Sequence, residues 1–263
     1  MFLNNKAARL QKIREITKEM QQVSVAFLSN ALNVSEPTVR SNLEELEKEG
    51  FLTRFHGGAT LNSKEPVISR SELIYPEITN PKEKNIIGEL AAATISNRQG
   101  IFFGPGTTNY YAALALRKRT DLNVNVVTNN FYVAHALRGC GNFRLQFIGG
   151  TTPFDGYYTI SDNLEEILAN HYFDKVFFST DAVSLTSGYT LSDPVAFDII
   201  TKASLHSKEK VALLDSTKFD RQSFIKVGDL NFAQTFITDG PVPDHYSEQF
   251  RLYDVGIITP ATA

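Results

Sequence analysis

The chain contains 263 residues, of which 42% are hydrophobic and 21% charged, as in globular proteins, and this composition excludes a mainly disordered chain. No stretch approaches the ~18 uninterrupted apolar residues of a membrane-spanning helix, and the charged first twenty residues lack the apolar centre of a signal peptide. The single cysteine, Cys140, cannot form an internal disulfide, and no cysteine and histidine residues have the spacing of a zinc site. We therefore expect a cytoplasmic protein without metal or cofactor.

The net charge of −3 is unevenly distributed along the chain. Residues 1–60 contain eight basic and seven acidic residues, whereas the remainder contains more acidic than basic residues. This balance excludes a histone-like protein, in which bulk positive charge alone drives binding to nucleic acid.

Apolar residues at spacings of three and four predict two helices near the start of the chain. The first helix would bury Leu10, Ile13, Ile16 and Met20. The second would end near Asn33 and bury Leu28, Ala31 and Leu32.

A third helix is predicted to begin after Ser35, whose hydroxyl suits a cap position. Glu36 favours the positive end of the helix dipole, and Pro37 is tolerated because the first amides of a helix have no helical partners. Gly50 would end this helix, and its buried stripe would consist of Val39, Leu43 and Leu46.

Residues 51–61 form two β-prone runs around Gly57-Gly58, a pattern that predicts a hairpin. Three helices followed by a hairpin are typical of a winged helix-turn-helix domain, whose third helix enters the major groove of DNA. The third helix would present to DNA Ser35, Glu36, Thr38, Arg40, Ser41 and Asn42, and the wing would present Arg54, His56, Gly57 and Gly58.

Several of these residues also have a purely structural interpretation. Arg40 lies four residues from both Glu36 and Glu44, so it fits a solvated ion pair on the helix surface. His56 alone fits an inert turn residue, and Gly57-Gly58 alone fits a simple turn. The conjunction of all these features favours DNA binding.

Three segments resemble the N-terminal domain of the DeoR-type bacterial transcriptional regulators. They are Val-Ser-Glu-Pro-Thr-Val-Arg at 34–40, Leu-Glu-Lys-Glu-Gly at 46–50 and Thr-Arg-Phe-His-Gly-Gly-Ala at 53–59. The family pattern Thr-Val-Arg-Arg-Asp-Leu reads Thr-Val-Arg-Ser-Asn-Leu at 38–43, so one arginine of the family is replaced. The resemblance implies a DNA-binding regulator in which one DNA contact differs.

Residues 62–82 contain three prolines and no sustained periodicity, which predicts a linker between domains at 1–61 and 83–263. A helix is predicted from Glu83 to about Asn97. Apolar runs then alternate with helical stretches, which predicts a largely parallel α/β sheet covered on both faces. The predicted strands lie at 101–103, 124–127, 145–148, 176–178, 211–214, 235–237 and 255–258, and the predicted helices at 107–118, 131–138, 163–171, 194–207 and 243–252.

Polar and glycine-rich segments follow most of these strands, and ligands of open α/β sheets bind beyond the carboxyl ends of the strands. Gly106-Thr107-Thr108 opens a helix and offers free amides, hydroxyls and the positive end of a dipole, which suits a phosphate. Lysines would add positive charge, and Asp181 would accept hydrogen bonds from sugar hydroxyls. The predicted effector-binding residues are Gly104, Gly106, Thr107, Thr108, Thr128, Asn129, Gly149, Gly150, Asp181, Lys202 and Lys218.

These residues too have structural alternatives. Glycine-threonine turns are common after strands, Asp181 and Asp215 fit caps of the turns that follow, and Lys202 fits a solvated helix residue. The segment from Gly104 is not a Gly-x-x-x-x-Gly-Lys loop, and it departs from Gly-x-Gly-x-x-Gly because residue 109 is Asn. Nucleotide binding through those motifs is therefore not expected.

With these segments, the resemblance to the DeoR-type family extends over nearly the whole chain. It implies an effector domain that is related in fold to ribose-phosphate isomerase and coenzyme A transferases and binds phosphorylated sugars or their breakdown products. The matching segments are 106–108, 127–129, 149–150, 215–219 and 237–239, together with Asp181 and Lys202.

The chain departs from the family at two positions of this domain. Gly104 stands where the family often has an aspartate, and Ser161-Asp162, preceded by Tyr157-Tyr158, stands where a glycine is common. The loss of a hydroxyl acceptor and the added aromatic bulk imply a reshaped pocket.

Two functions from different classes fit the sequence. The first is a repressor of a carbohydrate-utilisation operon, a homo-dimer or tetramer that binds operator DNA and is controlled by a sugar phosphate. The second is a sugar-phosphate isomerase with an N-terminal assembly domain, in which Asp181 or Asp155 moves a proton between carbons. The winged-helix signature has no role in such an enzyme and favours the regulator.

Overall fold

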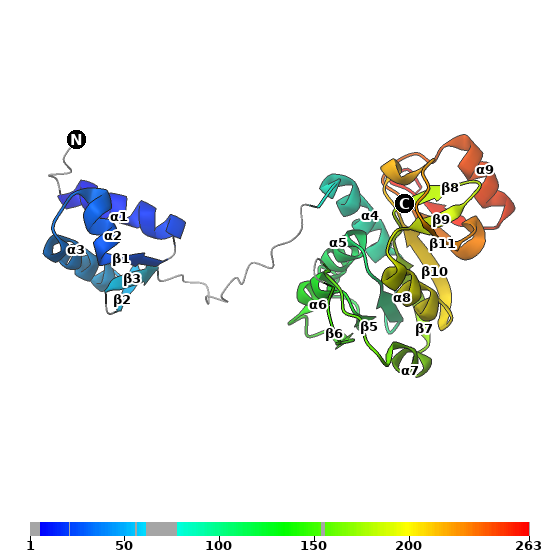
Figure 1. Ribbon diagram of the computed structural model, residues 1–263, viewed down its shortest axis with the longest axis horizontal. Helices are drawn as coiled ribbons and strands as arrows, with labels where there is room; N and C mark the ends of the chain where they lie inside the picture. The colour runs from blue at the N-terminus through cyan, green and yellow to red at the C-terminus, as the bar shows by residue number, and fades with distance from the viewer. Residues whose placement is uncertain (1–5, 21, 56, 62–77, 154–155, 263) are drawn as a thin grey trace. The chain divides into compact units, whose positions relative to one another are not determined.

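The computed structural model describes residues 6–20, 22–55, 57–61, 78–153 and 156–262. The chain divides into two compact units, Met1–Tyr75 and Pro76–Ala263 (Figure 1). Within the described ranges, no helix has the length and apolar content that crossing a membrane requires.

The first unit combines three helices with a small antiparallel sheet. Its elements are α1 (Lys6–Met20), β1 (Gln22–Ser24), α2 (Val25–Leu32), α3 (Glu36–Lys48), β2 (Leu52–Phe55) and β3 (Gly58–Leu61). The predicted hairpin is confirmed, because β2 pairs with β3 over their full lengths. Strand β1 pairs with the other edge of β3 and was not predicted, since three residues are too few to show an alternating pattern.

The core of the first unit confirms the predicted stripe of α3, since Val39, Leu43 and Leu46 are fully buried. The predicted faces of α1 and α2 were partly wrong. Met20, the last residue of α1, is half exposed. Ala31 is exposed as well, because the stripe of α2 runs through residues 25, 28 and 32, and Ala31 is turned from its centre by roughly a quarter of a turn.

The second unit is built on a seven-stranded sheet in the order β13-β12-β10-β7-β4-β5-β6, in which all neighbouring strands are parallel. All the predicted strands are present, and the predicted parallel α/β fold is confirmed. The strands are β4 (Gly100–Phe103), β5 (Val124–Thr128), β6 (Phe143–Phe147), β7 (Phe173–Phe178), β10 (Ser207–Leu213), β12 (Thr235–Ile237) and β13 (Gly256–Ile258).

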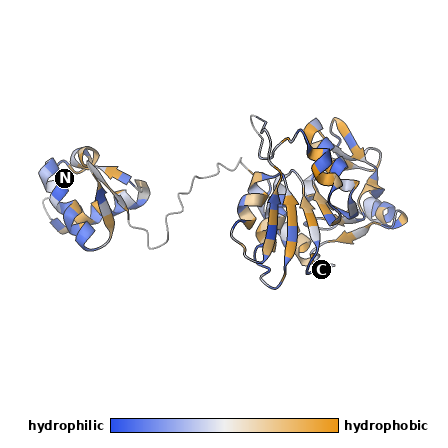
Figure 2. Cartoon of the chain, turned by 90° about the horizontal axis from the view of Figure 1, so that it is seen from below, coloured by the Kyte–Doolittle hydropathy of each residue, from blue (hydrophilic) through white to orange (hydrophobic). Residues whose placement is uncertain are grey.

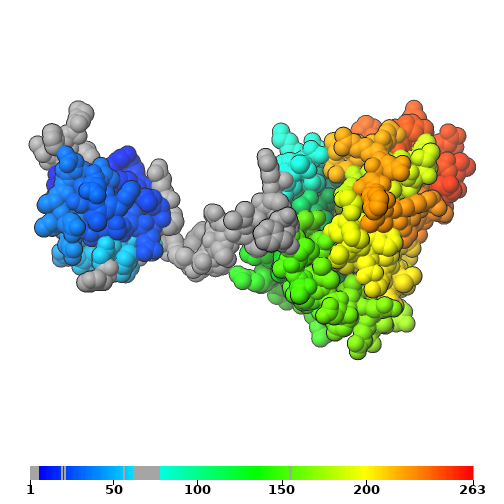
Figure 3. Space-filling model, viewed as in Figure 1, coloured from blue at the N-terminus to red at the C-terminus, as the bar shows by residue number. Residues whose placement is uncertain are grey.

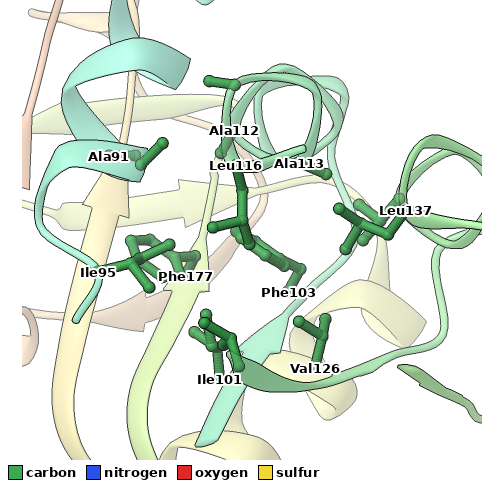
Figure 4. Close-up of a cluster of buried hydrophobic side chains, with 14 of the residues drawn as sticks. Ala91, Ile95, Ile101, Phe103, Ala112, Ala113, Leu116, Val126, Leu137 and Phe177 are labelled. Atoms are coloured by element: carbon green, nitrogen blue, oxygen red, sulfur yellow. The ribbon is translucent and has the colours of Figure 1, made fainter. Parts of the chain in front are cut away.

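Helices cover both faces of this sheet. Helices α4 (Pro81–Ala93), α5 (Thr107–Leu116) and α6 (Phe131–Leu137) pack on one face, against Ile101, Phe103 and Phe177 (Figure 4). Helices α7 (Leu164–Ala169), α8 (Pro194–Ser204) and α9 (Asp244–Leu252) pack on the other. Figure 2 shows the strands largely in orange, as expected of parallel strands that are buried on both faces.

A second, antiparallel sheet in this unit was not predicted. It has the order β11-β9-β8 and consists of β8 (Ala182–Ser184), β9 (Gly188–Leu191) and β11 (Ile225–Gly228). Its side chains pack in the same cluster as those of α9. Two 3-10 helices, η1 (Ser216–Lys218) and η2 (Leu230–Phe232), complete this part of the unit.

The predicted linker ends earlier than expected. Helix α4 begins at Pro81, with Asn80 as its N-cap, and not at Glu83. The side-chain amide of Asn80 donates to Asp215 Oδ1 and to Thr217 Oγ1, both at 3.2 Å, and this contact ties the start of α4 to the segment after β10. Residues 78–82 therefore belong to the second unit, while residues 62–77 lie outside the described residues.

Candidate DNA-binding surface and effector crevice

The first turn of α3 is polar and largely exposed. Glu36, Arg40 and Ser41 are exposed, and Arg40 Nη2 lies 3.2 Å from Glu36 Oε2 in the ion pair that their spacing predicted. Ser35 occupies the N-cap position, but its hydroxyl lies 2.9 Å from Thr38 Oγ1 and does not cap a described backbone amide. The turn therefore offers donors and acceptors that can read base edges.

Asn42 was wrongly predicted to face DNA. It is 2% exposed, because residues 39, 42, 43 and 46 lie on the same face of α3 and this face packs into the core. Its Nδ2 has no hydrogen-bond partner among the described residues. The polarity of Asn42 indicated a DNA contact, but its position on the buried face of α3 excludes one in this conformation.

The wing is attached to the start of α2. Gly57 has φ 93° and is exposed, and its carbonyl accepts a hydrogen bond from Val25 N at 2.9 Å. Gly58 is buried, and a Cβ atom there would lie 2.3 Å from Val23 O, so its role is structural and the predicted DNA contact is wrong. His56 lies outside the described residues.

Arg54 binds a carboxylate of the recognition helix. Its amide donates to Glu47 Oε1 at 2.8 Å, and its Nε donates to Glu47 Oε2 at 2.7 Å. These two bonds hold the pKa of Glu47 below its usual value, with the backbone bond contributing most. Arg54 therefore fixes the wing to α3, and with 40% of its side chain exposed it is still accessible to DNA.

In the second unit, the order of strands reverses at β4. The chain runs from β4 to β5 and β6 on one side, whereas β7 and the later strands lie on the other. Loops that leave neighbouring strands in opposite directions open a crevice at this switch point. The two loops touch, since a Cβ atom on Gly106 (φ 121°) would lie 3.1 Å from Ser179 Cβ, and Gly104 N donates to Phe177 O of β7 at 3.0 Å.

The loop after β4 leads into the first turn of α5, where Thr107 is half-buried and Thr108 is buried. Amides in this turn lack helical partners and lie at the positive end of the helix dipole. Two residues that we did not predict shape the loop. Asn109 Nδ2 donates to Gly104 O at 3.0 Å, and Asn130 Nδ2 donates to Gly106 O at 3.1 Å.

Thr128 and Asn129 were predicted to line the crevice; both are fully buried, and contact of either residue with an effector stays a prediction. The Thr128 hydroxyl donates to Phe103 O at 2.7 Å and accepts from Asn130 N at 3.0 Å. Asn129 Nδ2 donates to Thr159 O at 2.8 Å. Both residues support the walls of the crevice.

Gly149 and Gly150 follow β6 and differ in their surroundings. Gly150 has φ 148°, and a Cβ atom there would lie 2.0 Å from Ile160 O, so this position requires glycine. Gly149 is exposed and has open space around its Cα atom. The structure thus gives Gly150 a conformational role, and contact of either glycine with an effector stays a prediction.

Asp181 lies beyond the end of β7 and is exposed. Its Oδ2 accepts hydrogen bonds from Ser192 N and Ser192 Oγ, both at 2.7 Å. Tyr157, whose ring stacks on Tyr132 at 5.6 Å between centroids, lies nearby. Burial, together with the carboxylates of Asp181 and Asp193, raises the pKa of Tyr157 to about 12.

Lys202 is not in the crevice. It lies in the last turn of α8, roughly 12 Å along the helix from the end that faces the crevice, and its Nζ pairs with Asp198 Oδ2 at 2.9 Å. The alternative interpretation, a solvated residue of a helix surface, is therefore the correct one.

A buried lysine that we did not predict lies next to Lys218. Lys84, in the first turn of α4, is 5% exposed, and its Nζ has Thr79 Oγ1 at 3.5 Å. Burial lowers the pKa of Lys84, the carboxylate of Asp215 opposes this change, and the charge of Lys218 adds to it. The three charged groups are thus close enough to affect one another.

Asp215 has one carboxylate oxygen free for a ligand. Its Oδ1 accepts from Asn80 and Thr217, whereas its buried Oδ2 has no hydrogen-bond partner among the described residues. A buried carboxylate oxygen without a donor is costly, so this atom suits a ligand hydroxyl.

The sequence carried a signal for Lys84, which interrupts the apolar stripe formed by residues 87 and 91.

Lys84 lies level with the first turn of α5. A Cβ atom on Gly88 would lie 2.6 Å from Tyr111 O, so α4 and α5 touch at these residues. Lys84 precedes Gly88 by about one turn, as Thr107 precedes Tyr111. Both helices run from the carboxyl edge of the sheet, and their first turns therefore lie side by side.

An exposed recognition helix with a wing, followed by a unit whose crevice combines helix amides, lysines and carboxylates, defines a ligand-responsive DNA-binding regulator. The chain belongs to the DeoR family. Residues 9–65 match the DeoR-like helix-turn-helix domain, and residues 79–240 match the DeoR C terminal sensor domain. The predicted family and the winged helix-turn-helix class are thereby confirmed.

Two relatives resemble the chain over almost its whole length. The lactose phosphotransferase system repressor of Lactococcus lactis subsp. lactis is 34% identical over 255 residues, 95% of this chain and 97% of the relative. The putative aga operon transcriptional repressor of Escherichia coli O157:H7 is 28% identical over 255 residues, 95% of this chain and 92% of the relative.

Ribose 5-phosphate isomerase A of Methanocaldococcus jannaschii is a solved structure that aligns with the chain at 16% identity and a TM-score of 0.39. The alignment covers 52% of this chain and 53% of that structure, which is about half the length of the isomerase. The expected relation to coenzyme A transferases stays a prediction.

Proposed function

We propose that this regulator is a repressor of a carbohydrate-utilisation operon and that a sugar phosphate controls it. The observation that carries this proposal is the pair Lys84 and Asp215, which are linked through Asn80. A buried ammonium group lies beside the first turn of α5, near a buried carboxylate oxygen that has no hydrogen-bond partner among the described residues. A phosphate would bind the helix amides and the lysines, and a sugar hydroxyl would donate to Asp215.

The remaining crevice residues fit the rest of such a ligand. Lys218 is half-buried at the end of η1 and adds a second positive charge. Asp181 accepts hydrogen bonds at the mouth of the crevice, and the ring of Tyr157 offers an apolar surface for a sugar. The name of one relative supports a sugar-related operon, since it refers to a lactose phosphotransferase system.

Thermal unfolding with and without ligand tests this proposal. Hexose and pentose phosphates should raise the melting temperature, because a ligand at ~100 Kd adds about 2.7 kcal/mol to the free energy of unfolding. The unphosphorylated sugars serve as controls and should have no effect. Lys218→Ala should lose the response. Lys208→Ala should keep it, because Lys208 lies at the start of β10, at the edge of the sheet opposite the crevice. A stronger response to the free sugars would contradict a phosphate ligand.

The proposed repressor is a homo-oligomer without catalytic activity that acts in the cytoplasm. One winged-helix domain makes few phosphate contacts, and paired domains on repeated half-sites make twice as many. Light scattering at micromolar concentration should give the mass of a dimer or tetramer, and a monomer would contradict the proposal.

The isomerase alternative is tested directly by turnover. Asp181, one of the two carboxylates considered for proton transfer, already accepts hydrogen bonds from Ser192, and Asp155 lies outside the described residues. Incubation with pentose and hexose phosphates should give no isomerised product, and steady turnover would favour the enzyme.

A further inference from the structure

The edge of the seven-stranded sheet opposite the crevice carries an unusual excess of positive charge. Helices α5 and α6 end at this edge, and β4, β5 and β6 begin there. Residues 97–147 contain one acidic residue, Asp121, and six basic residues: Arg98, Arg117, Lys118, Arg119, Arg138 and Arg144. The rest of this unit is acidic, so the charge is concentrated on one surface.

The three loops that carry these residues, together with the start of β6, are in contact. Arg98 N donates to Asn123 O at 2.6 Å, which joins the loop before β4 to the loop before β5. Asn142 Nδ2 donates to Arg119 O at 3.1 Å and to Leu122 O at 2.6 Å, which joins the loop before β6 to the same segment. The basic residues therefore lie on neighbouring segments at one edge of the unit.

Within the described ranges, ion pairs neutralise only a minority of this charge. Lys118 pairs with Glu89 and Arg119 with Asp121. The other four arginines, which we name the basic edge, form no ion pair with an acidic residue in the described ranges: Arg98, Arg117, Arg138 and Arg144. All four side chains are exposed.

The other half of the same edge shows the opposite pattern. At the starts of β7 and β10, Lys175 pairs with Glu209 and Lys208 pairs with Asp174. In Figure 3, the residues of the basic half lie in the green part of the unit, and the later strands and helices lie in its yellow to red part. The excess charge is thus a local property of the first three strands and not of the whole edge.

The basic edge also has a receptive shape. A hollow of about 460 Å³ lies between the loops and is lined by Arg98 and Arg144 together with the asparagines at 123, 125 and 142. Arg98 has φ 65°, a conformation that is uncommon for residues other than glycine. One guanidinium group can bind two oxygens of a phosphate through two parallel N–H bonds, and asparagine amides supply further donors.

We infer that the basic edge is a second DNA contact, which binds backbone phosphates of the duplex without reading its sequence. Four guanidinium groups, spread over three loops and the start of β6, match a ligand with repeated charges better than a single small anion. Duplex DNA is such a ligand, and it is already the partner of the first unit. The contact adds affinity and leaves sequence recognition to α3.

Salt-dependent binding of the full chain to a 40-base-pair duplex of random sequence tests this inference. The variant carries Arg117→Gln, Arg138→Gln and Arg144→Gln and keeps Arg98 because of its backbone conformation. Each phosphate contact that is lost should flatten the plot of log affinity against log salt by ~0.9, so a total change of about 1 to 3 and at least a tenfold weaker binding at low salt are expected. Arg251→Gln, on α9 before β13 at the far end of the sheet, is the matched control and should bind as the wild type does.

Unchanged melting temperatures should show that the variant is folded. An unchanged salt slope in the triple variant would overturn the inference. So would a change in its mass by light scattering without a loss of DNA binding, because the basic edge would then join copies of the chain.

Discussion

Glu47 on α3 accepts hydrogen bonds from the backbone amide of Arg54 at 2.8 Å and from its guanidinium Nε at 2.7 Å. These bonds hold the wing beside the recognition helix. Arg54 was expected to contact DNA, and in the structure it first of all joins two DNA-binding elements. This arrangement makes the two residues energetically dependent on each other.

Glu47→Ala and Arg54→Ala should therefore each weaken binding to an operator selected from a randomised duplex library, by about tenfold, and the double variant should be no weaker than either. The loss arises because the wing is no longer held in place. A double-mutant cycle by fluorescence anisotropy measures it. If Glu47→Ala tightened binding while Arg54→Ala weakened it, Arg54 would act as an independent phosphate contact.

Arg40→Ala should reduce the preference for the selected operator over an unrelated duplex by about 1–3 kcal/mol, since a bidentate contact with a base is worth that much. Lys48→Ala is the control, because Lys48 also lies on α3 and pairs with a residue one turn before it, Glu44. Equal effects of the two substitutions would indicate that Arg40 is only part of a surface ion pair.

Asn42→Leu should raise the free energy of unfolding by about 1 kcal/mol, because a similarly shaped apolar side chain replaces a buried amide whose nitrogen has no partner in the described part of the chain. Affinity for DNA should not change. The control is its exposed neighbour, Ser41→Ala, which should weaken DNA binding and leave stability unchanged. Chemical denaturation and gel shifts distinguish the two effects.

Lys84→Met should abolish the response to sugar phosphates and raise the free energy of unfolding of the ligand-free protein by about 1 kcal/mol, since burial lowers the pKa of Lys84 and so disfavours its charged form. The exposed Lys82→Met is the control. The gain should be largest at neutral pH and should shrink as the pH rises from the lowered pKa toward the unfolded value of about 10.4, where the wild-type lysine loses its charge. Denaturation of the wild type and of Lys84→Met at several pH values measures how this gain in the free energy of unfolding changes with pH.

Gly150→Ala should destabilise the second unit by about 2 kcal/mol or more, because a Cβ atom would clash with the backbone carbonyl of Ile160. Gly149→Ala should change stability by less than ~0.5 kcal/mol, since nothing lies near the added atom. Thermal unfolding of the two variants provides the comparison. Similar losses in both would contradict a special role of Gly150.

The strands of the large sheet were predictable because each is a short apolar run that is followed by a helix. Strands β8, β9 and β11 were not, since their pairing depends on segments that are distant in sequence, such as Leu191 and Ile225. At the site, Gly106 was predictable from its position after a strand. Lys84 interrupts an apolar stripe of the sequence, but its place beside α5 was not predictable, because it depends on the packing of Gly88 against Tyr111. The predicted place of Lys202 in the crevice was wrong, because α8 runs away from the crevice and Lys202 lies in its last turn.

The bond between Gly57 O and Val25 N, together with the tight packing of Gly58 on β1, holds the wing against β1 and the start of α2. An effector then has little to gain from bending the wing or tilting the recognition helix. In an oligomer, an effector can instead change the distance between two such units along the DNA. Operators should accordingly tolerate insertions of a whole helical turn between half-sites far better than insertions of half a turn, which place the second half-site on the opposite side of the duplex.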